Sequence, residues 1–225
     1  MLQKFKRRLS HAGFWADKTA GHPPNPEYCK REDAGCDVFA LAAFLTAPYA
    51  LSMKRQRLSR QSWVDAGLKA LVAKGPASLA AEPLARDLET TKGSFYWHFK
   101  DVPEFQKTVV QHWQAKAFSE VVDALAQDGQ PDDRLRRFGK LVLSNREEAA
   151  MRAWAHSDKT AAKAVKQVDA ERLKFFNALL GQLGITNEGF ARSCVAALIG
   201  LPNLGSKTTA QSSYEALIDL VLALK

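Results

Sequence analysis

The chain has 225 residues, enough for one large domain or two small ones. Apolar residues make up 46% of it and charged residues 25%, as in an ordinary folded protein with a buried core. The net charge of +8 suits a polyanionic partner, and the lack of any run of 18 apolar residues excludes a membrane-spanning helix.

Residues 1–52 differ in character from the rest of the chain. They contain the breaker-rich stretch GHPPNPEYCKREDAG, followed by an apolar stretch that Pro48 interrupts. Two interpretations stay open: a poorly ordered extension, or translated upstream sequence ahead of a biological start at Met53. We expect one domain over 53–101 and a second over 102–225.

From Ser59 onward the pattern predicts three short helices. Ser59 is a good N-cap residue, and apolar residues follow at helical spacing until Gly75-Pro76 ends the run. A second helix is expected over 81–88, and Thr91 caps a third after a tight turn at Glu89-Thr90. Three such helices with a tight turn between the last two describe a helix-turn-helix.

The third helix carries the crowded stretch TTKGSFYWHFKD, residues 90–101. At about 100° per residue, Phe95 and Phe99 share one strip, which we expect to pack on the first two helices. The strip opposite begins with Gly93, which allows close approach of a backbone, and the two flanking strips carry hydrogen-bonding groups. The row is therefore a core strip plus a surface suited to a polar partner.

DNA is the partner that this surface predicts. Residues 53–102 hold nine Lys and Arg against five Asp and Glu, whereas residues 103–225 hold sixteen against fourteen. A recognition helix in the major groove would place Lys92 and Tyr96 against base edges, with Ser94, His98 and Lys100 on phosphates. The full predicted DNA-binding set is Thr90, Thr91, Lys92, Gly93, Ser94, Tyr96, Trp97, His98 and Lys100.

The sequence pattern of residues 103–225 also predicts helices. Asp101 and Glu104 form a candidate capping box, and apolar residues then recur four apart. Aromatic and Met side chains between helices line apolar pockets or simply form core. The candidate pocket residues are Phe105, Val109, Trp113, Met151, Trp154, Phe175 and Leu179.

The last two predicted helices have wide apolar faces. These faces suit a four-helix dimer interface, although one of them could instead close the core of the monomer. The candidate interface residues are Phe190, Cys194, Ala197, Leu198, Leu201, Tyr214, Leu217 and Val221.

Other functional classes lack support in the sequence. No Gly-x-Gly-x-x-Gly loop, Gly-x-Ser-x-Gly elbow, His-Glu-x-x-His helix or phosphate-binding loop is present, so we expect no enzyme. Three scattered cysteines give neither a disulfide framework nor a Cys-x-x-Cys zinc pair. We expect no metal, no cofactor, no membrane association and a cytoplasmic location.

The stretches SRQSWVDAGLKALVAKG and PLARDLETTKGSFYWHFKD resemble the DNA-binding domain of the tetracycline-repressor (TetR) family. Glu89-Thr90 stands where that family usually has glycine and a small apolar residue. The resemblance implies a homodimeric all-α regulator with an N-terminal helix-turn-helix domain and a larger helical domain for effector binding and dimerisation. The positions that match DNA contacts of the family are Thr91, Lys92, Gly93, Tyr96, Trp97, His98 and Lys100.

A second stretch, REEAAMRAWAHSDKTAAKAVKQVDAERLKFFNALLGQLG, is similar to the effector domain of one TetR subgroup. Together the resemblances imply a repressor that binds a palindromic double-stranded DNA operator and is released by a small, largely apolar ligand. A DNA-binding regulator with no small-molecule effector is the alternative.

Overall fold

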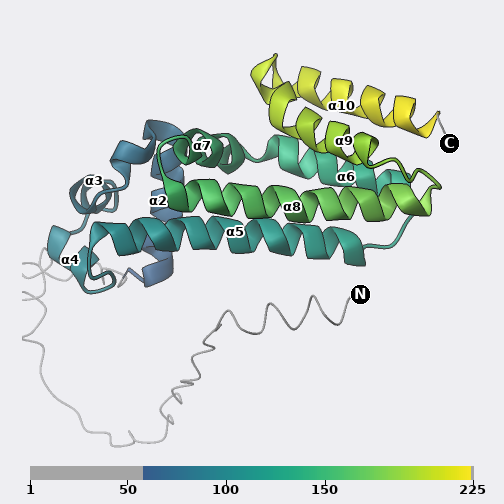
Figure 1. Ribbon diagram of the computed structural model, residues 1–225. Helices are drawn as coiled ribbons and strands as arrows, with labels where there is room; N and C mark the ends of the chain where they lie inside the picture. The colour runs from purple at the N-terminus through teal and green to yellow at the C-terminus, as the bar shows by residue number, and fades with distance from the viewer. Residues whose placement is uncertain (1–57, 224–225) are drawn as a thin grey trace, which may run out of the picture. The chain divides into compact units, whose positions relative to one another are not determined.

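The computed structural model describes residues 58–223, where every regular element is a helix, so the all-α prediction is confirmed. The expectations for residues 1–52 fall outside these residues. Labels follow Figure 1 and start at α2. The elements are α2 (Arg60–Lys74), η1 (Pro76–Ser78), α3 (Ala81–Asp87), α4 (Lys92–Tyr96), α5 (Val102–Ala126), α6 (Pro131–Ser144), α7 (Arg146–Ala155), α8 (Lys159–Gln182), α9 (Glu188–Gly200), η2 (Leu201–Asn203) and α10 (Lys207–Leu222).

The helix ends follow the capping signals of the sequence. The Ser59 side chain accepts a hydrogen bond from the Ser62 amide, and the Ser62 hydroxyl accepts one from the Ser59 amide. At the other end of α2, Gly75 has a φ of 77°, a region that favours glycine. Asp101 caps α5, and Asn187 caps α9. The first helix therefore begins and ends where the sequence predicts.

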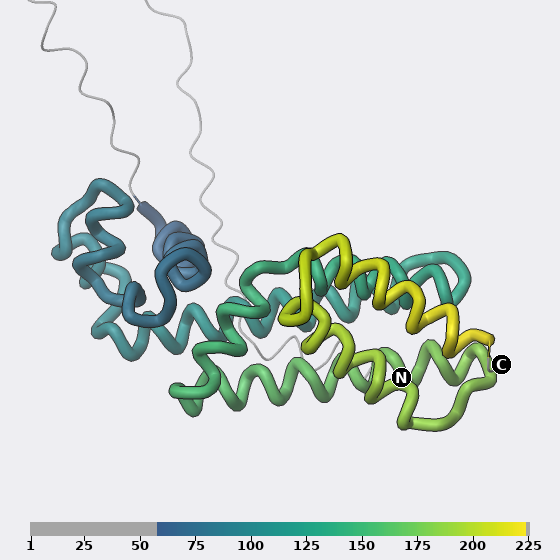
Figure 2. The backbone as a smooth tube through the Cα atoms, turned by 90° about the horizontal axis from the view of Figure 1, so that it is seen from above, coloured from purple at the N-terminus to yellow at the C-terminus, as the bar shows by residue number. Residues whose placement is uncertain are grey.

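The described residues, 58–223, belong to one compact unit in which α5 and α8 lie side by side. The short helices α2, α3 and α4 gather around the first turns of α5 at one end (Figure 1). Toward the other end, α9 and α10 lie together over α6 and α8 (Figure 2). Helix α5 thus runs from the helix-turn-helix into the larger helical region without a break.

Two hydrophobic cores divide this unit. The first joins α2, α3, Phe95 and Phe99 to the first half of α5, to α7 and to the start of α8. The second joins the end of α5 to α6, the end of α8, α9 and α10. The first core crosses the expected domain boundary after Asp101, because Phe105 of α5 is in the same cluster as Phe95.

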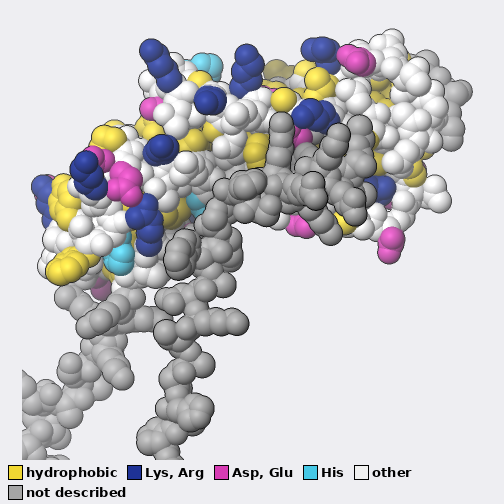
Figure 3. All heavy atoms as spheres, turned by 60° about the horizontal axis from the view of Figure 1, so that its bottom comes forward, with side chains coloured by type: hydrophobic (Ala, Val, Ile, Leu, Met, Phe, Trp, Pro, Cys, Tyr) yellow, Lys and Arg dark blue, Asp and Glu magenta, His cyan; other side chains and the backbone are white. Residues whose placement is uncertain are grey.

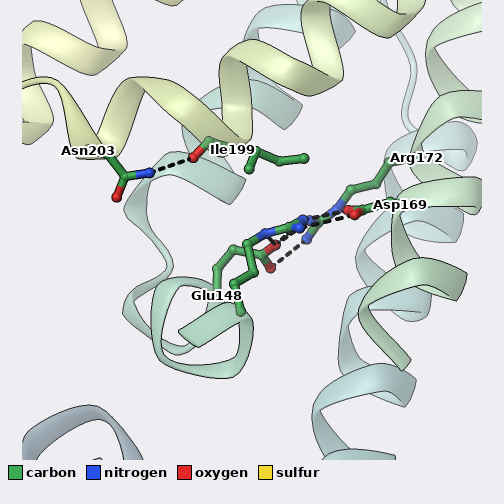
Figure 4. A network of polar contacts seen from close by, with 6 residues as sticks. Glu148, Asp169, Arg172, Ile199 and Asn203 are labelled. Atoms are coloured by element: carbon green, nitrogen blue, oxygen red, sulfur yellow. Dashed lines mark hydrogen bonds and ion pairs between the residues drawn. The ribbon is translucent and has the colours of Figure 1, made fainter. Parts of the chain in front are cut away.

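A set of charges with a buried centre ties α7 to α8 (Figure 4). Glu148 and Arg172 are buried and Arg152 and Asp169 are half-buried, and we call these four residues the buried network. Arg172 Nη1 and Nη2 donate to the two Glu148 oxygens at 2.7 and 3.0 Å. Arg152 Nε donates to Glu148 Oε1 at 2.7 Å, and its Nη1 donates to Asp169 Oδ2 at 3.0 Å. Burial acts to raise the pKa of Glu148, but the two arginines lower it below its ordinary value.

Candidate nucleic-acid interface

The turn between α3 and α4 is tight, and backbone hydrogen bonds tie it to α3. The Leu88 amide donates to Leu84 O at 2.9 Å, and the Thr90 amide donates to Ala85 O at 2.8 Å. Glu89 has a φ of 50°, the left-handed region that glycine adopts most easily. The chain therefore has a glutamate rather than a glycine at the left-handed position of this turn.

Helix α4 is short and its buried side is aromatic. Thr91 caps it by accepting from the Ser94 amide at 3.3 Å, as predicted. Phe95 is fully buried and Phe99 is 1% exposed, so the predicted core strip is confirmed. The helix ends at Tyr96, earlier than the continuous helical layout of the sequence implied. Phe99 still reaches Phe95 because its amide donates to Phe95 O at 3.1 Å.

An aromatic cluster fixes α4 to its neighbours. The Phe95 ring lies 5.4 Å from the Trp63 ring of α2 and 5.3 Å from the Phe105 ring of α5, both edge to face. Phe99 lies 4.9 Å from Phe105. Such contacts add roughly 0.5–1.5 kcal/mol per pair beyond the burial of apolar area. The cluster sets the position of α4 on α2 and α5.

The outer side of this unit presents large and basic side chains to solvent. Trp97 is 88% exposed and Tyr96 is 48% exposed. In Figure 3, hydrophobic and basic side chains lie close together over this end of the described residues, with acidic side chains among them. Of the predicted DNA-binding set, the structure places Thr91, Lys92, Gly93, Tyr96, Trp97 and Lys100 as exposed, and Thr90, Ser94 and His98 as half-buried.

Gly93 is not required by packing inside the chain. A Cβ at this position would meet only Thr91 Oγ1, at 3.7 Å, which is an ordinary van der Waals contact. Its φ lies outside the left-handed region, so an L side chain is not strained there either. Packing among the described residues therefore does not explain why residue 93 is a glycine.

Arg60 joins the ends of three helices, a role that the sequence analysis missed. Its guanidinium donates to the His98 carbonyl, to Glu104 Oε1 at 2.9 Å and to Thr108 Oγ1 at 3.2 Å. It also lies 4.3 Å from the centre of the Phe99 ring. We call Arg60, the His98 carbonyl, Glu104 and Thr108 the Arg60 network. It links α2, the segment after α4, and α5.

Glu104 differs in one detail from the capping box that the sequence predicts. Asp101 Oδ1 accepts from the Glu104 amide at 2.8 Å, which is the predicted half. The Glu104 carboxylate instead accepts from the Lys100 amide at 2.8 Å. Its bond to Arg60, and then the Lys100 bond, lower the pKa of this carboxyl. Glu104 is thus bonded to the segment just after α4.

The structure divides the candidate pocket residues between the two cores. Phe105, Val109, Trp113, Met151 and Trp154 belong to the first core, and Phe175 and Leu179 to the second. All seven are buried, and the Phe105 ring packs on Phe95 and Phe99 at the helix-turn-helix end of the first core. Phe105 reaches α2 through Gly67, where a Cβ would stand 2.7 Å from its ring.

The candidate dimer residues separate by exposure. Cys194, Leu198, Tyr214 and Val221 are buried in the second core, so they take the alternative role of closing the monomer. Phe190, Ala197, Leu201 and Leu217 are half-buried. Leu204 and Leu220, which the sequence analysis did not select, are 83% and 61% exposed. Apolar side chains therefore stay at least partly exposed on α9, on α10 and in the segment between them, namely Phe190, Ala197, Leu201, Leu204, Leu217 and Leu220.

Three further findings concern the described residues. Burial raises the pKa of Cys194 to about 11, which leaves its thiol protonated at neutral pH. Within residues 58–223 no group of three His, Cys, Asp or Glu is placed to hold a metal ion. In the same part of the chain, no helix combines the length and the apolar character needed to cross a bilayer.

The fold and this surface define an all-α helix-turn-helix protein, and comparison with known proteins agrees. No family model matches the chain. It is 27% identical over 161 residues to the transcriptional regulator AcuR of Cereibacter sphaeroides, a match covering 71% of this chain and 63% of that regulator's length.

Solved structures are similar at lower sequence identity. A transcriptional regulator from Rhodococcus sp. Rha1 has a TM-score of 0.62 at 17% identity, covering 74% of this chain and 97% of that one. A TetR-family transcriptional regulator from Streptomyces coelicolor has a TM-score of 0.62 at 14% identity, covering 75% and 91%. The chain has the TetR-family fold, and the resemblance seen in its sequence is confirmed.

Proposed function

We propose that the chain is a sequence-specific DNA-binding transcriptional regulator that acts as a dimer. The observation that carries this proposal is the two-sided build of α4 and the turn after it. Phe95 is fully buried against Trp63 and Phe105, while Trp97 is 88% exposed next to Tyr96. A fixed short helix with exposed aromatic and basic groups suits the major groove of DNA.

Electrostatics support the same partner. Lys92 and Lys100 are exposed, and no ion pair holds either side chain within residues 58–223. A lysine that neutralises a phosphate releases counterions, which gives binding that weakens with salt. In this arrangement Lys92 and Tyr96 face base edges, whereas Lys100 holds the backbone.

The direct test starts from DNA of random sequence, from which the full chain selects its binding site. Fluorescence anisotropy then compares the selected duplex with a scrambled one. Lys92→Ala and Tyr96→Ala should each cost about 1–3 kcal/mol on the selected duplex. Lys100→Ala should weaken both duplexes alike, and Lys166→Ala, on an exposed face of α8, is the matched control. Failure to select any sequence would refute the proposal.

Gly93 gives a test that separates DNA contact from folding. Because Gly93→Ala meets nothing closer than 3.7 Å, the stability of the chain should stay the same or rise by up to about 1 kcal/mol. If the DNA backbone approaches this position, the affinity for the selected duplex should still fall. Unchanged affinity would remove Gly93 from the interface.

The dimer is proposed to form through α9 and α10. Leu220 on α10 and Leu204, the residue just after η2, are the most exposed large apolar side chains in this part of the chain. Two copies of the helix-turn-helix must sit about 34 Å apart to enter successive major grooves of a palindrome. Leu220→Glu should yield monomers in sedimentation velocity, and Leu141→Glu, at an exposed apolar position on α6, should not.

We further propose that a small, largely apolar ligand releases the DNA, which makes the protein a repressor. Helix α5 runs from the first core into the second. A ligand that binds more tightly to one position of α5 than to another can therefore change the position of α4. The alternative is a regulator with no effector. A thermal-shift screen distinguishes the two, since a bound ligand raises the melting temperature by mass action.

A further inference from the structure

A cleft of about 560 Å³ opens between α2 and the helices of the larger region. Helix α2 supplies one wall, α5 supplies a second, and the end of α6 with the start of α7 supplies the third. A smaller hollow of about 330 Å³ shares Leu68, Lys69, Lys116 and Glu147 with it. This volume is in the range of ligand sites. The candidate pocket residues of the sequence analysis do not line it.

The walls of the cleft are partly apolar. Leu68 is buried and Val72 is half-buried on α2, and Leu141 projects from α6 with 42% of its surface exposed. Covering these side chains with an alkyl or aryl group removes apolar area from water, at about 25 cal/mol per Å². An apolar ligand segment therefore has a place to pack.

The charges of the lining favour an anion. Lys116 Nζ lies 3.0 Å from Glu147 Oε2, so these two neutralise each other. Lys69 and Arg146 line the cleft without an ion pair or hydrogen bond to any residue in 58–223. The first turn of α7, which Asn145 caps, adds the positive end of a helix.

Glu120 is the opposing charge in the lining. It is half-buried, and burial raises the pKa of its carboxyl. No ion pair or hydrogen bond to Glu120 occurs within the described residues, although Lys116 and Arg172 act on it electrostatically. With Glu147 paired, Lys69 and Arg146 outweigh this single carboxylate.

We propose that this cleft binds a small amphiphilic carboxylate, with its apolar part on Leu68, Val72 and Leu141 and its carboxylate at Lys69 and Arg146. The proposal that this carboxylate is the effector rests on the proposed function. The cleft joins α2 to α5 and α7, so the ligand contacts the helix-turn-helix and the larger region at once. A ligand changes the affinity for DNA only if it binds more tightly to one spacing between these helices than to another.

The first experiment varies the charge of the ligand at constant chain length. Isothermal titration calorimetry with the full chain compares octanoate, octanamide and octylamine. Octanoate should bind about fivefold or more tightly than octanamide, as an ion pair of about 1 kcal/mol implies. Octylamine should bind most weakly. Tighter binding of octylamine, which Glu120 would favour, or equal binding of all three would overturn the proposal.

The second experiment places the ligand in the cleft. Lys69→Gln and Arg146→Gln should each weaken octanoate binding by about twofold to fivefold, because both groups are partly solvated. Leu141→Ala should weaken octanoate and octanamide alike. Lys163→Gln, an exposed lysine of α8 outside the lining, is the matched control. If none of the cleft variants changes the affinity for octanoate, octanoate binds elsewhere and the inference is wrong.

The third experiment separates this inference from the proposed function. Anisotropy on the selected duplex is measured without ligand and then with octanoate. An absence of sequence-specific binding without ligand refutes the proposed function, while the calorimetry still decides the cleft. Octanoate should lower DNA affinity in the unaltered chain and do so less in Arg146→Gln. Octanoate bound in the cleft with no change in DNA affinity would refute its role as effector.

Discussion

The two arginine-centred networks hold the molecule together in opposite ways. The buried network joins the short helix α7 to the long helix α8, and its Arg172 and Glu148 side chains are 2% and 9% exposed. The Arg60 network joins three helix ends at the surface, and its Arg60 and Glu104 side chains are 47% and 40% exposed. Burial makes the first network costly to break, whereas water can replace partners in the second. The chain thus combines a largely buried connection between α7 and α8 with a solvent-exposed connection beside the proposed DNA-binding surface.

The largest effect should come from removing Arg172. Arg172→Met leaves the Glu148 carboxylate buried with one guanidinium instead of two, and we expect a loss of about 3–5 kcal/mol in the free energy of unfolding. Urea denaturation measures it. Arg192→Met is the control, because Arg192 is exposed on α9 and its guanidinium lies 3.9 Å from the Glu188 carboxylate. This change should lower the free energy of unfolding by less than about 0.5 kcal/mol. Equal losses in both variants would break the comparison.

A smaller effect is expected from Arg60. Arg60→Ala removes three hydrogen bonds and a cation–π contact at an exposed site, which should cost about 1–2 kcal/mol. It should also weaken specific DNA binding, because the segment after α4 loses its tie to α5. Arg86→Ala, at a 77% exposed arginine of the same unit, is the control for both measurements. A stability loss without any change in DNA affinity would limit Arg60 to folding.

Acid should act on both networks in the same direction. The pKa values of Glu104 and Glu148 are lowered from an ordinary 4.5, so the unfolded chain binds these protons first. Their stabilisation is present above about pH 4.5 and is lost as the pH falls through the folded pKa values. Between pH 3 and 6, the free energy of unfolding should depend less on pH for Arg60→Ala than for Arg86→Ala. Identical pH profiles would show that Arg60 does not set the Glu104 pKa.

Salt should give the smallest effect and the sharpest contrast. Exposed charges are screened at 1 M salt, where the Debye length is about 3 Å, whereas buried pairs are screened much less. The cost of Arg60→Ala should therefore shrink by a few tenths of a kcal/mol between about 0.05 and 1 M sodium chloride. The cost of Arg172→Met should stay nearly constant. A parallel decrease in both would mean that water reaches the buried network.

Local signals in the sequence predicted the helix-turn-helix well. The caps at Ser59, Thr91 and Asp101 and the strip of Phe95 and Phe99 depend only on nearby residues. Arg60 could not be found in this way, because Glu104 and Thr108 lie 44 and 48 residues further along the chain. Partners at such separation become visible only when the fold brings the helix ends together.

The apolar faces of α9 and α10 illustrate a second limit. Helical spacing identifies an apolar stripe but not the surface that covers it. Tyr214 and Cys194 lie in the monomer core, and Leu220, two positions after Ile218, faces solvent. The cleft was missed for a related reason, since its lining comes from four separate helices. Neither result follows from the periodicity of a single helix.

The exposure of Trp97 gives the molecule a built-in optical probe. Among residues 58–223, Trp63, Trp113 and Trp154 are at most 5% exposed, whereas Trp97 is 88% exposed. The fifth tryptophan, Trp15, lies outside the described residues, so the measurement uses a Trp15→Phe variant. In this variant, iodide in solution should quench the fluorescence of Trp97 far more than that of Trp63, Trp113 and Trp154. If DNA covers this indole, adding the duplex protects it from iodide, and the fraction protected reports occupancy of the recognition surface without any attached dye.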